Sequence, residues 1–165
     1  MPSNDFRVYC LTISVLLCFT LTGCGHNFDF YKKRADMIRT HNEAFQAHLK
    51  ANQIAAAIYE NEEIEATASE VAASIRKRGK PLPKDQVDYE WRLLKTAIDT
   101  ALKNWLALGR QLTMDKKYDQ ARAAYQRILD TYTGEAEQPY RERAARAKRD
   151  IDILNPPVSV SAPNL

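Results

Sequence analysis

Residues 26–78 contain neither glycine nor proline, the two residues that most often interrupt a helix, and are rich in Ala, Glu, Lys, Gln and Arg. A single helix of this length would be roughly 75 Å long, so a helical hairpin is the compact alternative. Its break is expected near Asn52 or in the polar run Glu60–Glu63. Segment 28–82 is therefore predicted to be one long helix or a hairpin. Its apolar positions recur at steps typical of a helix: Tyr31, Ala35, Ile38, Phe45, Leu49, Ala56, Tyr59, Ala68, Val71, Ala72 and Ile75.

Three more helices are expected after residues 79–83, where Gly79, Pro81 and Pro83 stop the preceding one. They cover about 84–114, 118–132 and 139–154, with a short turn at 115–117 and a link from Gly134 to Pro139. The chain is thus predicted to be all-α, and its tail, 155–165, to be disordered. The expected inward positions are Val87, Trp91, Leu94, Ala97 or Ile98, Ala101, Trp105, Leu108, Leu112, Ala121, Tyr125, Ile128, Leu129, Tyr140, Ala144, Ala147, Ile151 and Leu154.

The N-terminus is typical of an export signal. Residues 8–20 are uncharged and mostly apolar, and as a helix they would span roughly 20 Å, less than the roughly 30 Å of a bilayer's hydrocarbon core. That length favours a secretory signal over a permanent anchor. An uncleaved anchor stays open, because the uncharged stretch continues through Gly25.

Leu21-Thr22-Gly23-Cys24, at the end of that stretch, resembles the lipobox of bacterial lipoproteins. The resemblance implies that the chain is cut between Gly23 and Cys24 and that fatty acyl chains, such as palmitate, anchor Cys24 to a membrane. Residues 1–23 would then be the signal peptide and 24–27 a lipid-anchored linker. Gly25, rather than aspartate, after the cysteine favours the outer membrane, facing the periplasm.

All three cysteines, Cys10, Cys18 and Cys24, lie in the first 24 residues. After cleavage the rest of the chain would have no thiol for a disulfide, a nucleophile or a metal.

Residues 102–135 resemble one tetratricopeptide repeat (TPR), a pair of antiparallel helices. Seven positions carry the resemblance at the family's spacing: Trp105, Leu108, Gly109, Leu112, Tyr118, Ala121 and Tyr125. Ile128 and Thr133 depart from it, because the family favours a small residue and a proline there. Stable arrays need about three repeats, so neighbouring helices would complete the domain. The resemblance implies a short right-handed array over 83–154 with a capping helix.

No residues suggest catalysis, a cofactor or a metal site. Histidines occur only at His26, His41 and His48, and no metal-binding or phosphate-loop motif is present. The acidic cluster Glu60, Glu62, Glu63 and Glu65 is interpreted as a solvated face, although it could lie against the basic run Arg141, Arg143, Arg146, Lys148 and Arg149. That run could instead touch acidic partners or lipid head groups. The net charge of +3 is too small to indicate nucleic-acid binding.

The favoured hypothesis is a lipid-anchored scaffold that binds an envelope protein or peptide through its TPR-like surface and is not an enzyme. Candidate partner-binding residues are Asn104, Arg110 and Gln111. The alternative is a structural spacer or coiled-coil lipoprotein that self-associates or bridges envelope layers, which the long uninterrupted segment supports.

Overall fold

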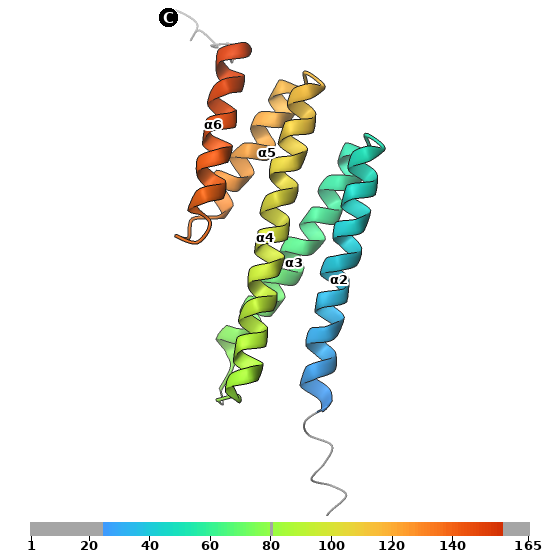
Figure 1. The fold of residues 1–165 in the computed structure, drawn as a ribbon, viewed down its shortest axis with the longest axis vertical. Coiled ribbons are helices and arrows are strands. Elements are labelled where there is room, and N and C mark those ends of the chain that lie inside the picture. The colour runs from blue at the N-terminus through green and yellow to red at the C-terminus, as the bar shows by residue number, and fades with distance from the viewer. Residues whose placement is uncertain (1–24, 80, 157–165) are drawn as a thin grey trace, which may run out of the picture. The chain divides into compact units, whose positions relative to one another are not determined.

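The computed structural model describes residues 25–79 and 81–156, with side chains from Asp29 onward. About 85% of these residues are helical, and the described part of the chain contains no strand, so the all-α prediction is confirmed. The helices are α2 (Gly25–Lys50), α3 (Ile54–Lys77), α4 (Lys84–Met114), α5 (Tyr118–Thr131) and α6 (Gln138–Leu154) (Figure 1).

Contacts within the chain divide it into residues 1–36 and 37–165, so the boundary falls inside α2. In the first unit, the rings of Phe30 and Tyr31 meet edge to face with centroids 5.1 Å apart. The guanidinium of Arg34 lies 4.2 Å from the centroid of Phe30, a cation–π contact that covers an aromatic ring on the helix surface.

The segment without glycine or proline is divided at Asn52, one of its two expected breaks. Asn52 has φ of 55°, a left-handed conformation that asparagine tolerates better than most residues, and the backbone N–H of Gln53 bonds to the carbonyl of His48. The run Glu60–Glu63 continues within α3. The helix α2 starts at Gly25 and therefore includes residues 25–27.

The core of residues 37–156 is built by successive packing of α3 on α4, α4 on α5 and α5 on α6, with a further contact between α4 and α6 (Figure 1). The largest fully buried apolar side chains come from all of these helices and the end of α2: Phe45, Ile64, Val71, Leu102, Leu108, Leu112, Tyr125, Ile128 and Ile151.

Three residues expected inside are exposed. Trp91 is 55% exposed because the buried face of early α4 runs through Glu90, Leu93 and Ala97, so that Trp91 points about 100° away from it. Tyr59 is 57% exposed for the same reason, since α3 turns Ala57, Asn61 and Ile64 inward. Leu154 is 68% exposed at the last residue of α6.

Candidate functional site

The α4–α5 hairpin holds the seven residues that resemble a tetratricopeptide repeat. All are buried except Tyr118, which is half-buried at the start of α5. The closest approach is at Gly109, where a Cβ atom would lie 2.6 Å from two ring carbons of Tyr125. The two helices therefore pack at a distance that only glycine permits at this position.

A furrow runs between α3 and α5, with α4 as its floor. Its part nearest Asn52 has a volume of about 630 Å³, and the part nearest Tyr132 has about 480 Å³. The larger part is mainly apolar, with Ile54 and Ile58 on one side, Ala123 and Ala124 on the other, and Trp105, Leu108 and Leu112 below.

Glu65, on α3, lies between the two parts of the furrow. Its carboxylate links α3 to α4 and α5. One of its carboxylate oxygens accepts hydrogen bonds from Trp105 Nε1 at 2.8 Å and from the Tyr132 hydroxyl at 2.5 Å. The other accepts from Arg127 Nη2 at 2.8 Å. Burial, followed by the hydrogen bond to Glu65, raises the pKa of Tyr132 far above 10.0, and the separate hydrogen bond from Arg127 to Glu65 raises the pKa of Arg127. Because these partners come from α4 and α5, Glu65 fixes the position of α3 relative to both.

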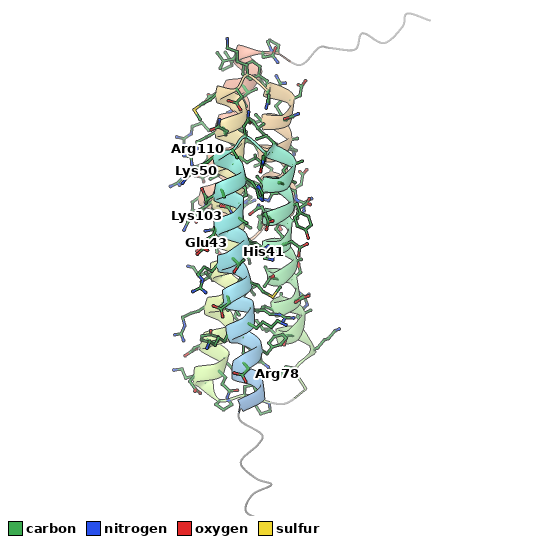
Figure 2. All side chains as sticks on the ribbon, turned by 90° about the vertical axis from the view of Figure 1, so that its right-hand side faces the viewer. His41, Glu43, Lys50, Arg78, Lys103 and Arg110 are labelled. Carbon is green, nitrogen blue, oxygen red and sulfur yellow. The ribbon has the colours of Figure 1, made fainter. Side chains whose placement is uncertain are left out.

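The cleft between α4 and α6 is smaller, about 310 Å³, and combines aromatic walls with cations. Tyr125, Leu106, Tyr140 and Ala147 form its apolar surface. Three exposed cations surround it: Lys103 and Arg110 two turns apart on α4, and Arg143 on α6. Figure 2 shows Lys103 and Arg110 projecting from the same side of the helices.

The three cleft cations form no ion pair with any carboxylate in residues 29–79 or 81–156. Other cations nearby are paired: Arg122 with Asp119 and Asp152, and Lys148 with Asp152. Around the cleft these three cations outnumber the carboxylate of Asp99, which lies beside Tyr140, and the excess positive charge favours an anionic group there.

The two tyrosines of the cleft have raised pKa values. Burial raises the pKa of Tyr125, against a hydrogen bond with Thr113 and the charge of Arg110. Burial also raises the pKa of Tyr140, as does Asp99, whose Oδ1 accepts a long hydrogen bond of 3.5 Å from the Tyr140 hydroxyl. Both side chains are therefore neutral at neutral pH and can offer ring surface to a ligand.

Of the three residues expected to contact a partner, only Arg110 lines a cleft. Asn104 is 2% exposed, and its Oδ1 accepts a hydrogen bond from Gln46 Nε2 at 3.2 Å. Gln111 is half-buried and donates to Asp115 at 3.1 Å. Lys103 was missed, although residues 103, 106 and 110 are spaced three and four apart and so share a helix face with Arg110.

The interpretation of the acidic cluster as a solvated face is wrong for two of its members. Glu65 is the half-buried junction described above, with a side chain 14% exposed. Glu60 is 16% exposed, and its Oε2 lies 2.7 Å from His41 Nδ1, while its Oε1 lies 4.0 Å from His48 Nε2. The cluster also does not lie against the basic run, because α3 and α6 make no contact.

Gly23 and Cys24 lie outside the described residues, as does most of tail 155–165. Within the described part of the chain, no helix has the length and apolar character needed to cross a membrane, and no three His, Cys, Asp or Glu side chains are grouped as metal ligands. The chain matches no family model, and no curated protein or solved structure is detectably similar to it. The geometry of its own residues must therefore carry any functional argument.

Proposed function

We propose that the chain is a lipid-anchored protein of the bacterial envelope that binds an acidic segment of a partner protein in the α4–α6 cleft. The observation that carries this proposal is the group of three unpaired cations around an aromatic cleft, Lys103, Arg110 and Arg143. Carboxylates of a partner would pair with these cations, and one of its apolar side chains would occupy the space between Tyr125 and Tyr140.

The anchoring part of the proposal rests on the sequence. The motif Leu21-Thr22-Gly23-Cys24 follows an apolar stretch of the right length for a signal, and acylation at Cys24 would supply a lasting anchor, proposed to lie in the outer membrane and to leave the helices in the periplasm. Mass spectrometry of the natural product tests it: the expected N-terminal peptide begins at an acylated Cys24. An unmodified thiol with residues 1–23 attached would disprove it.

A TPR-like arrangement, with the hairpins stacked as a right-handed array, is likewise proposed. The close approach of Gly109 to Tyr125 and the short turn between α4 and α5 support it. In such an array α6 would be the capping helix, and the cleft would lie between the first helix of the repeat and that cap.

Photo-crosslinking in intact cells tests the binding function. A photoreactive amino acid at Leu106, inside the cleft, should give a discrete protein adduct, whereas one at Ala47, exposed on α2, should not. Arg110→Glu and Arg143→Glu should each abolish the adduct, while Arg146→Glu, at an exposed cation of α6 outside the cleft, should leave it intact. Equal adducts in all three variants would rule out the cleft as the binding site.

The alternative spacer function predicts an elongated oligomer. Its main support was an uninterrupted segment, and that segment folds back at Asn52, with His41 of α2 beside Glu60 of α3. Light scattering of the lipid-free mature chain separates the two functions, because the scaffold is expected to be a compact monomer and the spacer an elongated assembly.

A further inference from the structure

The end of α3 and the beginning of α4 present several exposed cations and one exposed tryptophan. Arg76 and Lys77 close α3, Lys84 opens α4, and all three are exposed. Trp91 follows two turns into α4 and is 55% exposed, whereas the chain's other tryptophan, Trp105, is 5% exposed. An indole in this position is unusual, because tryptophan is highly buried on average.

An ion pair holds this surface in place. Arg78 in the α3–α4 loop pairs with Glu90, whose side chain is fully buried. Since Glu90 and Leu93 occupy the inner face of α4, the neighbouring Trp91 is directed outward. Figure 2 shows Arg78 at the end of the helices opposite to the α2–α3 turn near Lys50. The indole of Trp91 is kept on the surface because Glu90 and Leu93 fix the inner face of α4.

The exposed charges at the end of α3 and on the first three turns of α4 are predominantly positive. Asp85 and Asp88 are exposed on the first two turns of α4, but more cations than carboxylates are exposed here: Arg76, Lys77, Lys84, Arg92 and Lys95. Trp91 lines none of the hollows described above.

We propose that this surface, Arg76, Lys77, Lys84 and Trp91, binds the head groups of an anionic phospholipid bilayer. Lysine and arginine attract anionic lipids, and tryptophan partitions into the head-group region because its ring is apolar while its N–H can still bond to water or phosphate. The inference rests on the proposed anchor at Cys24, which would keep the domain close enough to a bilayer for a weak surface to act.

Tryptophan fluorescence of the mature lipidated protein in vesicles containing brominated lipids tests the proposal. Quenching of Trp91 is expected to be at least about twofold greater when roughly one third of the lipid is phosphatidylglycerol than with phosphatidylcholine alone. Trp105 supplies a buried reference, so Trp91→Phe should leave only a signal that does not depend on lipid charge. Arg76→Glu/Lys77→Glu and, separately, Lys84→Glu should remove the difference, while Arg146→Glu/Arg149→Glu, at exposed cations of α6, should retain it.

Equal quenching in the two lipids would overturn the proposal, as would loss of the difference in the α6 variant. A blue shift of Trp91 that depends on protein concentration in detergent would instead indicate that a second copy covers the indole. Failure of the anchor is distinguishable, because it appears as a missing acyl mass on Cys24, and the protein can then be added to preformed vesicles for the same measurement.

Discussion

Gly109 of α4 packs directly against the ring of Tyr125 of α5, so closely that a Cβ atom on the glycine would lie 2.6 Å from ring carbons Cε1 and Cζ. Tyr125 is 2% exposed, so its ring cannot move away from an added Cβ atom without shifting its packed neighbours. Gly109→Ala is therefore expected to lower the free energy of unfolding by about 1–3 kcal/mol, the usual cost of overpacking. The gain of up to about 1 kcal/mol that alanine brings to a helix offsets only part of it. Urea denaturation measures the change.

Gly79 provides the matched control for that substitution. No atom lies within 4 Å of the Cβ that Gly79→Ala would add, so this variant should be neutral or slightly more stable than wild type. If Gly109→Ala proved equally neutral, the close approach of α4 and α5 would not be a constraint on the fold.

Glu65 should make a larger contribution to stability than an exposed carboxylate. Glu65→Ala leaves Trp105 Nε1 and the Tyr132 hydroxyl without their acceptor in a partly buried site, and the expected loss is about 2–4 kcal/mol in the free energy of unfolding. A double-mutant cycle with Arg127→Ala should assign only about 0.5–1 kcal/mol to the ion pair, since the Arg127 side chain is 46% exposed. Glu62→Ala, at an exposed residue of the same helix, is the control.

The helices were largely predictable because their signals are local. Segments 79–83, 115–117 and 134–139 lie between periodic apolar segments, and the first and last of them contain glycine and proline. The helices α4, α5 and α6 begin and end within about one residue of the expected positions. The choice between one helix and two in segment 28–78 depended on whether Asn52 adopts a left-handed conformation, which the sequence permits but does not require.

The polar interior was not predictable, because periodicity records only apolar residues. Glu90 and Asn104 are buried and Glu65 is half-buried, and their partners are distant in sequence, such as Arg127 for Glu65 and Gln46 for Asn104. Helical spacing alone cannot reveal these partners. The same limitation applies to the cleft: Arg110 was expected to contact a partner, but the contribution of Arg143 depends on how α6 packs against α4.

Tyr132 should make the protein less stable in alkali. Its pKa is raised in the folded state, mainly by burial and then by Glu65, while in the unfolded chain it returns to about 10. The stabilisation is complete below pH 10 and declines as the pH rises, because only the unfolded state then loses the proton. The expected slope is about 1.4 kcal/mol per pH unit for this residue.

Comparing Tyr132→Phe with wild type isolates that contribution. The variant should be less stable at pH 7, where it lacks the hydrogen bond to Glu65, and the difference should shrink steadily above pH 10. Tyr59→Phe, at a ring 57% exposed, controls for loss of a phenol. A difference that is independent of pH between 9 and about 11.5 would contradict the raised pKa.

Lys116, in the turn between α4 and α5, is a site where a single substitution should stabilise the protein. Its φ of 57° costs a residue with a Cβ atom about 1–2 kcal/mol, and replacement by glycine removes that cost. The turn itself should persist, because its bonds from the N–H of Lys116 to Thr113 and of Lys117 to Leu112 are between backbone atoms. The greater freedom of glycine in the unfolded chain offsets about 0.5–1 kcal/mol of that gain, so Lys116→Gly should raise the free energy of unfolding by about 0.5–1 kcal/mol.

Lys95→Gly, at an exposed position inside α4, is the matched control and should lower the free energy of unfolding by about 1 kcal/mol. Thermal unfolding of both variants should therefore give shifts of opposite sign, and a loss of stability in both would mean that the left-handed conformation at Lys116 is not strained.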